Sequence, residues 1–315
     1  MNIAILGAGG VAAALAWALE PLSPTVVSRS AVHRIQLSGP VVPQPVVRTV
    51  RWHPWDAPAS PRWDLLLVAV KCPALPAVGE WMERHAPEVP ALLWMNGMGQ
   101  EAALARFRHG PLFPVVATLA VRELERGADR RHFQLNSLGA SFLPQSAAPW
   151  VKPLAETAER TAAWPWVMLA DAKLVERRWI KLIQNSVINP LTALTGLLNG
   201  AVTDHPLFSL ASPLVGEAEA VARAEGVPLP AGMLSEVKAL ARATAHNASS
   251  MLQDVWRRHP TEIDSINGFI VRCGLRHRIA CPTQRVVWRL VRQWEASWGF
   301  EAGNQSGVEP ERERT

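Results

Sequence analysis

The sequence is poor in cysteine, with three among its 315 residues. Cys72, Cys273 and Cys281 have no CxxC spacing, so the sequence indicates neither a disulfide framework nor a zinc site. This use of cysteine fits a reducing cytoplasm, where disulfides are rare. We therefore expect a cytoplasmic protein that folds without disulfides and binds no metal.

The sequence also lacks runs of basic residues and long apolar segments. Its 32 Lys and Arg against 27 Asp and Glu give a net charge of +5, spread along the chain, which favours anionic ligands in general but gives little support for nucleic-acid binding. No segment approaches the roughly 18 uninterrupted apolar residues of a membrane span. The apolar stretch Ala12–Leu19 does not indicate a secretory signal, because no Lys or Arg precedes it and Gly7, Gly9 and Gly10 interrupt it. We expect neither a nucleic-acid partner nor a membrane.

The composition is that of a globular protein, 49% hydrophobic and 19% charged, and the length suits about two domains. The first half alternates short β-branched runs with helical stretches, which is the pattern of strands joined by crossovers in a parallel sheet. The expected strands are Asn2–Leu6, Thr25–Ser28, Asp64–Val70, Pro90–Trp94 and Phe113–Thr118. A weaker alternation over His132–Leu143 predicts an edge hairpin around Asn136–Gly139, whereas the proline-rich stretch Pro40–Pro61 cannot be assigned.

The pattern changes after about Asp171, where long helical periodicity replaces the strand-like runs. This change predicts a domain boundary. We expect an α/β domain with a doubly wound parallel sheet over residues 1–170, followed by an all-α helical domain over residues 171–300. Residues 301–315 are Gly, Glu, Arg and Pro without apolar spacing and predict a disordered tail.

A glycine-rich turn follows the first expected strand directly and leads into a helical stretch. Its sequence, Gly7-Ala8-Gly9-Gly10-Val11-Ala12, matches the dinucleotide-binding fingerprint in its proper strand-turn-helix setting. Gly7 would permit the tight turn, Gly9 the approach of a pyrophosphate, and Ala12 close packing of the helix on the strand. The alternative is a glycine-rich turn without a ligand.

The residue at the end of the second strand indicates which dinucleotide binds. An NAD-binding protein has Asp or Glu there, about twenty residues after the turn, to hold the ribose 2′-hydroxyl. This sequence has Arg29, flanked by Ser28 and Ser30. A guanidinium pairs well with a 2′-phosphate, so the sequence favours NADP (NADPH) over NAD. Alternatively, Arg29 is a solvated loop charge and Arg34 supplies the contact.

Three polar residues share one face of the helix expected over Glu176–Leu194. Lys181, Asn185 and Asn189 follow one another at four-residue spacing. A solvated stripe would more naturally carry Lys and Glu than two asparagines, so we expect this stripe to line a cleft. Pro190 is expected to kink or end the helix near Asn189.

The segment Pro260–Asp264 has both a structural and a functional interpretation. In the structural one, Thr261 is an N-cap, Asp264 closes an approximate capping box, and Glu262 favours the helix dipole. In the functional one, Glu262 acts in a binding or catalytic site. The residues alone leave both open.

Several short motifs follow one another along nearly the whole chain. They are the glycine turn, Val70-Lys71, Asn96–Gly99, Lys181 with Asn185, Asn189–Ala193, Ser249–Asp254 and Thr261–Asp264. Each is weak alone, but the ordered set resembles the ketopantoate reductase (2-dehydropantoate 2-reductase) family. The resemblance implies an NADP-binding Rossmann domain followed by a helical domain, with the active site in the cleft between them.

The resemblance also implies roles for individual residues. Lys181 matches the catalytic lysine, and Glu262 matches the glutamate that assists it and contacts the substrate hydroxyl. The positions that match ketopantoate-binding residues are Asn185, Asn189, Asn199 and Ser250. The positions that match cofactor-binding residues are Gly7, Gly9, Gly10, Ala12, Arg29, Lys71 and Asn96, with Asn96 beside the nicotinamide and both Lys71 and Arg29 beside the ribose and phosphate. The implied reaction is NADPH-dependent reduction of ketopantoate to pantoate, in pantothenate and coenzyme A biosynthesis; we also consider a homodimer.

Two departures from the family pattern keep other substrates open. The family usually has Tyr after Glu-Ile-Asp, where this chain has Ser265, and Ala117–Ala120 is more apolar than the family's loop. Hydride transfer to a ketone builds negative charge on its oxygen, which Lys181 could stabilise and protonate as a general acid. The alternatives are a reductase of another 2-oxo acid and a catalytically silent NADP-binding regulator. Retention of both Lys181 and Glu262 argues against the regulator.

Overall fold

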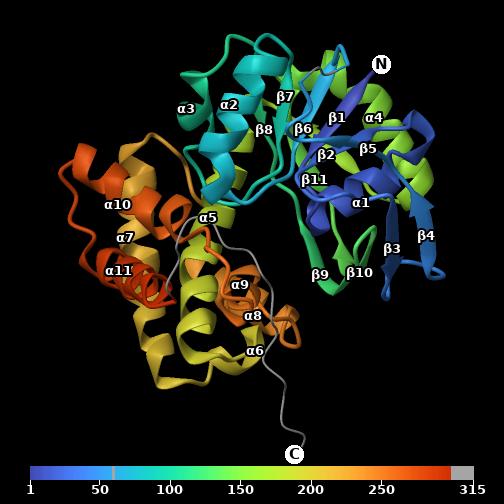
Figure 1. Cartoon of the computed structure of the whole chain (residues 1–315). Helices are drawn as coiled ribbons and strands as arrows, with labels where there is room; N and C mark the ends of the chain where they lie inside the picture. Colours follow the sequence, from blue (N-terminus) through green and yellow to red (C-terminus); the bar gives the residue numbers. More distant parts are fainter. Residues whose placement is uncertain (59–60, 299–315) are drawn as a thin grey trace, which may run out of the picture. The chain divides into compact units, whose positions relative to one another are not determined.

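The computed structural model describes residues 1–58 and 61–298 (Figure 1). The chain divides into two compact units, Met1–Leu182 and Ile183–Thr315, and the division falls inside the long helix α5 (Asp171–Thr195). Sequence periodicity placed the boundary at residue 170, immediately before α5 begins. The tail predicted over residues 301–315 lies outside the described residues.

Unit 1 is built on a six-stranded parallel sheet. Its order is β5-β2-β1-β6-β7-β8, and every neighbouring pair is parallel. The strands are β1 (Ile3–Leu6), β2 (Thr25–Ser28), β5 (Arg51–Pro54), β6 (Leu65–Val68), β7 (Ala91–Leu93) and β8 (Leu112–Pro114). The chain starts in the middle of the sheet and winds outward in both directions, which confirms the predicted doubly wound fold.

Both faces of this sheet are covered, so its central strands β1, β6 and β7 are buried throughout. Ile3 and Ile5 of β1 lie in one core with apolar residues of α1 (Gly10–Ala18) and α4 (Ala148–Ala162). The alternate residues of β1 lie in a second core with α2 (Leu75–His85) and α3 (Gln100–Ala105). Figure 1 shows α2 and α3 together beside β7 and β8. This two-sided burial accounts for the continuous apolar runs in the sequence.

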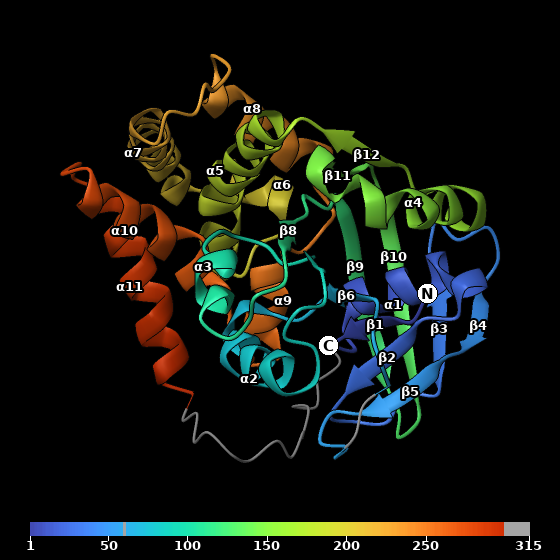
Figure 2. The same ribbon diagram turned by 90° about the horizontal axis from the view of Figure 1, so that it is seen from above.

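A second sheet of unit 1 has the order β4-β3-β10-β9. Its strands are β3 (Arg34–Ser38), β4 (Val46–Thr49), β9 (Leu119–Arg126) and β10 (Arg130–Leu138), and β11 (Ser141–Pro144) pairs separately with β12 (Trp166–Leu169). The β9–β10 hairpin packs against α1 (Figure 2). The proline-rich stretch contains β4 and β5.

The predicted position of the hairpin is wrong. The chain turns after Gly127, whose N–H donates to the Arg130 carbonyl at 2.8 Å, and not around Asn136–Gly139. Strand β9 carries mixed charged and apolar residues at the edge of its sheet, so it has no alternating pattern to detect. Gly139 is required for another reason, because a Cβ there would lie 2.6 Å from the Thr118 hydroxyl.

The sequence predicts that Pro190 kinks or ends the helix near Asn189; helix α5 continues past Pro190 to Thr195, so the helix does not end there. Proline lacks an N–H, which leaves the carbonyl of Ser186 without its helical donor. The side-chain amide of Asn267 donates to that carbonyl at 2.9 Å and to Gln284 Oε1 at 2.8 Å. A buried side-chain network thus replaces the missing helical bond.

Unit 2 is helical. Its helices are the remainder of α5 with α6 (Asn199–Val202), α7 (Ala211–Ala224), α8 (Met233–Ala243), α9 (Ser250–Trp256), α10 (Asn267–Arg276) and α11 (Pro282–Ala296). Helices α7, α10 and α11 pack against one another, as Figure 2 shows. Among the described residues of the whole chain, no helix combines the length and apolar character that crossing a membrane requires.

Candidate active site

The turn between β1 and α1 contains two glycines, Gly7 and Gly9, that differ in whether the fold itself requires glycine. Gly7 has φ +114°, and a Cβ there would lie 2.6 Å from the Ala69 carbonyl oxygen, so the fold itself requires glycine. Gly9 has φ −81°, and a Cβ would meet nothing within 4 Å. The fold does not require glycine at Gly9, which leaves open space directly beside the backbone.

The same turn contains backbone donors that have no acceptor within the helix. Helix α1 has Gly9 as its N-cap without a side-chain cap, and its first intrahelical bond runs from the Ala13 N–H to the Gly9 carbonyl at 2.9 Å. The N–H groups of residues 10–12 therefore have no intrahelical acceptor and carry the positive end of the helix dipole. Ala12 is buried, as the close packing of α1 requires. Open space beside Gly9 and uncapped donors together fit the pyrophosphate of a dinucleotide.

The other predicted cofactor residues lie at the same edge of the sheet. Arg29 follows β2, Lys71 follows β6 and Asn96 follows β7. These strands and β1 are adjacent and parallel, so their carboxyl ends meet at one edge, where doubly wound sheets bind ligands. The Asn96 carbonyl accepts hydrogen bonds from Gln100 Nε2 at 2.7 Å and Cys72 Sγ at 3.2 Å, which fixes the backbone after β7.

Arg29 and Lys71 are both exposed. Within residues 1–58 and 61–298, no ion pair holds the Arg29 guanidinium, so it is available to a ligand anion. The alternative contact, Arg34, is engaged with the Asp129 carboxylate at 2.9 Å. That ion pair holds the pKa of Asp129 below its usual range. The geometry therefore favours Arg29 over Arg34 as a phosphate contact.

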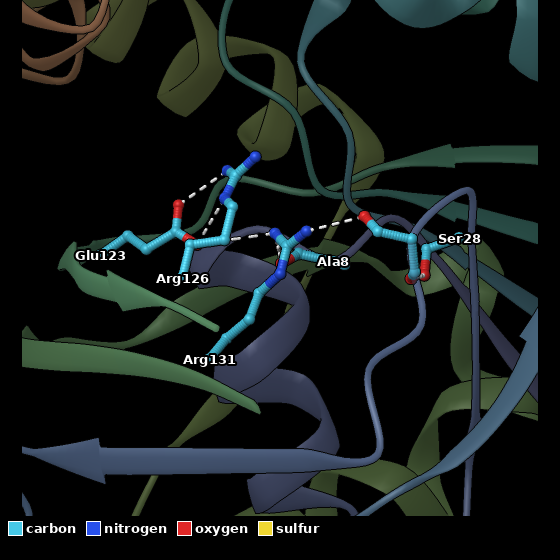
Figure 3. Close-up of polar contacts among 6 residues, drawn as sticks. Ala8, Ser28, Glu123, Arg126 and Arg131 are labelled. Carbon is cyan, nitrogen blue, oxygen red and sulfur yellow. Dashed lines mark hydrogen bonds and ion pairs between the residues drawn. The ribbon is translucent and has the colours of Figure 1, made fainter. Parts of the chain in front are cut away.

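Sequence reasoning missed Arg131 of β10, a buried arginine next to the glycine turn (Figure 3). Its guanidinium donates to the carbonyl of Ala8 at 2.9 Å and to the hydroxyl of Ser30 at 2.9 Å. A usable signal was present, because Arg131 continues the inward-facing alternation of Phe133 and Leu135, and an arginine at such a position is unusual.

The predicted polar stripe lies on α5. Lys181 donates from Nζ to the Ala117 carbonyl oxygen at 2.6 Å, and its side chain is half-buried. Asn185 and Asn189 follow it at one and two helical turns, with Asn185 half-buried and Asn189 buried. The helix therefore presents an ammonium group followed by two side-chain amides along one stripe, and none of the three positions is fully exposed.

Two of the other predicted substrate-binding residues lie at helix starts in unit 2. Asn199 begins α6 and donates from Nδ2 to Thr244 Oγ1 at 2.9 Å. Its Oδ1 is buried and has no partner among the described residues, so a ligand hydroxyl would satisfy it. Ser250 begins α9 and is half-buried, whereas the preceding Ser249 caps that helix by accepting from the Leu252 N–H at 3.0 Å.

The capping box, one of the two interpretations of Pro260–Asp264, is not formed. The Thr261 hydroxyl does accept from the Ile263 N–H at 3.2 Å, but the Thr261 N–H donates to Glu295 Oε1 at 2.8 Å. Asp264 instead accepts from Trp288 Nε1 at 2.7 Å. Glu262 is only 4% exposed, so it is not a solvated charge favouring a helix dipole. The capping interpretation does not explain this buried carboxylate.

The described residues hold no group of three or more His, Cys, Asp and Glu side chains arranged to bind a metal. The three cysteines are buried and unbridged. Burial raises the pKa of the Cys281 thiol to about 11.

The sequence matches two family models, "Ketopantoate reductase PanE/ApbA" over residues 3–138 and "Ketopantoate reductase PanE/ApbA C terminal" over residues 173–295. A 2-dehydropantoate 2-reductase of Vibrio cholerae is 30% identical over 95% of this chain and 99% of its own length. A dimeric ketopantoate reductase of Staphylococcus aureus has a similar fold, with a TM-score of 0.79 at 21% identity, covering 95% of this chain and 100% of the other. D-mandelate dehydrogenase, solved with NADH and anilino(oxo)acetate, shares the fold with a TM-score of 0.80 at 20% identity and the same coverage. The glycine turn, the strand-end residues and the polar stripe of α5 are thus found in a chain that belongs to the ketopantoate reductase family.

Proposed function

We propose that this protein is an NADPH-dependent reductase that converts 2-dehydropantoate to pantoate. The observation that carries the proposal is the position of Lys181, which lies on the same stripe of α5 as Asn185 and Asn189. Its ammonium group donates a hydrogen bond to the Ala117 carbonyl oxygen at 2.6 Å. The relative from Vibrio cholerae, matched over almost its whole length, carries the name of this activity.

The cofactor we propose is NADPH, which supplies the hydride when bound. The β1–α1 turn would hold the pyrophosphate through its uncapped amides. Arg29 would hold the 2′-phosphate, because it is exposed and without an ion pair among the described residues, whereas a carboxylate at its position would repel that phosphate. Lys71 would add a second cation beside the ribose, and Asn96 would lie beside the nicotinamide.

Lys181 would act on the carbonyl oxygen of the substrate. Negative charge grows on that oxygen as the carbonyl carbon is reduced, and an ammonium group stabilises this charge and then donates a proton. An ammonium has three donors, so the bond to Ala117 can fix the position of Nζ while another donor serves the substrate.

The remaining polar groups would orient the substrate. Asn185 and Asn189 offer amide donors and acceptors at successive turns of α5, and Asn199 has a buried acceptor that lacks a partner among the described residues. Ser250 would add a hydroxyl. Glu262 would accept from a substrate hydroxyl, because a buried carboxylate makes strong hydrogen bonds.

A second candidate is reduction of a different 2-oxo acid. The observation behind this candidate is Ser265, which occupies the position where the family usually has tyrosine. The fold is also that of D-mandelate dehydrogenase, an enzyme solved with NADH and a different ligand. We also propose a homodimer in the cytoplasm, in line with the dimeric reductase of similar fold.

Purified protein mixed with NADPH or NADH and a panel of 2-oxo acids would test the proposal, with loss of the nicotinamide absorbance as the readout. We expect the highest kcat/KM with ketopantoate and NADPH. Arg29→Ala should reduce the preference for NADPH by about ten- to a hundredfold, the equivalent of one charge-assisted contact. A higher kcat/KM with another 2-oxo acid would favour the second candidate, and no turnover with any would contradict both.

A further inference from the structure

Arg131 occupies a position where the sheet would otherwise place an apolar side chain. Strand β10 alternates buried and half-buried residues, and Arg131 lies on the same buried side as Phe133 and Leu135. Its side chain is only 7% exposed. A buried guanidinium loses much of its hydration and persists only where local contacts compensate for that loss.

The contacts of Arg131 join the two loops that flank the proposed cofactor position. One terminal nitrogen donates to the Ala8 carbonyl in the glycine turn (Figure 3). The other donates to the hydroxyl of Ser30, immediately after Arg29. The Ser28 hydroxyl in turn donates to the Ser30 carbonyl at 2.7 Å and accepts from Trp52 Nε1 at 3.1 Å. The loop that presents Arg29 is therefore tied to the glycine turn through one side chain.

The ion pairs around Arg131 leave an excess of positive charge. Glu123 Oε1 lies 3.6 Å from an Arg131 terminal nitrogen, but the same carboxylate accepts two hydrogen bonds from Arg126, at 3.1 and 2.8 Å. The two guanidinium groups and one carboxylate carry a net charge of +1, because arginine remains protonated in proteins. Burial, followed by the charge of Arg126, lowers the pKa of Arg131, while the Glu123 carboxylate opposes this shift.

We propose that Arg131 is a specificity-determining residue for the 2′-phosphate of the cofactor, acting by positioning the Ser28–Ser30 loop and by adding buried positive charge beside it. The inference rests on the proposed use of NADPH. The excess charge favours the dinucleotide that carries the additional phosphate, and the bond to Ser30 holds the loop that presents Arg29 in place before the cofactor arrives. A role confined to the structure would affect binding of NADP⁺ and NAD⁺ equally.

The test compares dissociation constants of NADP⁺ and NAD⁺, measured by calorimetry, in the wild type and in variants. Arg131→Met should weaken NADP⁺ binding by about tenfold or more, the effect of losing one charged partner, and change NAD⁺ binding by less than about threefold. Arg131→Lys keeps the positive charge but cannot donate from two fixed terminal nitrogens, so it should retain part of the preference for NADP⁺ over NAD⁺. The matched control is Arg130→Met, since Arg130 is the half-buried neighbour that pairs with Glu125 at 3.4 Å.

A second variant predicts a change of opposite sign. Glu123→Gln removes the carboxylate that partly neutralises Arg131, so NADP⁺ should bind about two- to fivefold more tightly while NAD⁺ binding stays the same. This variant and Arg131→Lys decide the question if Arg131→Met does not fold, as a thermal melt would show. Parallel losses for both dinucleotides in the Arg131 variants, or weaker NADP⁺ binding in Glu123→Gln, would overturn the inference.

The same measurements separate this inference from the proposed function. A wild type that binds NADP⁺ no more tightly than NAD⁺ contradicts the proposed use of NADPH, and the role of Arg131 falls with it. A wild type that prefers NADP⁺, with the same ratio in both Arg131 variants, contradicts only the role of Arg131.

Discussion

The two glycines Gly7 and Gly9 should respond oppositely to alanine, and this contrast tests whether the β1–α1 turn is shaped for a ligand. At Gly9 the backbone has φ −81°, and an added Cβ meets nothing within 4 Å. Gly9→Ala should therefore fold normally. Replacing glycine by alanine at an N-cap costs about 0.5–1 kcal/mol, and the lower entropy of the unfolded chain offsets about 0.4–1 kcal/mol of this cost.

Dinucleotide binding should nevertheless be strongly impaired in Gly9→Ala. The new methyl group occupies the open space beside the uncapped amides of α1, so a pyrophosphate can no longer approach them. Losing one charge-assisted hydrogen bond of about 1.5–3 kcal/mol raises the dissociation constant by about ten- to 150-fold. Gly7→Ala should instead lower stability, because its φ of +114° strains an alanine and its Cβ would lie 2.6 Å from the Ala69 carbonyl oxygen. The backbone strain alone is worth about 1–3 kcal/mol.

The assay is a thermal melt of each variant together with calorimetric titration of NADP⁺. We expect Gly9→Ala to melt within a few degrees of the wild type, as a change below about 1 kcal/mol implies, and to bind NADP⁺ weakly. Unchanged NADP⁺ affinity in Gly9→Ala would show that the pyrophosphate does not approach the turn. A large fall in its melting temperature would show that the fold needs glycine at this position, contrary to the geometry.

Four further variants test the site and the fold. Lys181→Ala should lower kcat by about 100-fold or more with NADPH affinity nearly unchanged, as steady-state kinetics and calorimetry would show; equal loss of cofactor affinity would contradict its assignment to the carbonyl. Glu262→Ala should raise KM and lower kcat together, whereas a fall in melting temperature alone would mean that the buried carboxylate is structural. Asn267→Leu should cost about 2–4 kcal/mol in urea unfolding, because the Ser186 carbonyl and Gln284 lose their donor; wild-type stability would refute that bond's importance. The folded-state pKa of Cys281 is raised to about 11, so the thiol's contribution to stability is complete below the unfolded pKa of about 8.5 and is lost as pH rises through 11. The urea midpoints of the wild type and Cys281→Ala should therefore converge over this pH range. A difference between the two midpoints that stays constant with pH would contradict the raised pKa.

The core of the parallel sheet could be predicted because its central strands are buried on both faces. Continuous apolar runs such as Leu65–Val68 stand out from their surroundings, and the fingerprint after β1 fixes which strand lies at the centre. Strands β4 and β5 were missed because their half-exposed sequences, which include proline and arginine, carry no such run. The hairpin was misplaced for a similar reason, since Gly139 resembles a turn residue but serves a close contact with Thr118.

The stripe on α5 could be predicted because helical spacing depends only on sequence. The continuation of α5 past Pro190 could not be predicted, because Asn267, the donor that replaces the missing helical N–H, is 81 residues from Ser186. The same holds for Arg131, which lies 123 residues from Ala8. Tertiary pairing of this kind leaves no local pattern, and an arginine in an alternating strand is only an indirect sign of it.

The most direct test of the account is the initial rate of NADPH oxidation with ketopantoate, measured for the wild type and Lys181→Ala. We predict saturable turnover by the wild type, with kcat/KM of about 10⁴ M⁻¹ s⁻¹ or more, and a loss of about 100-fold or more in the variant. A wild type that binds NADPH but leaves ketopantoate unreduced, or a Lys181→Ala variant that turns over at the wild-type rate, would contradict the central claim.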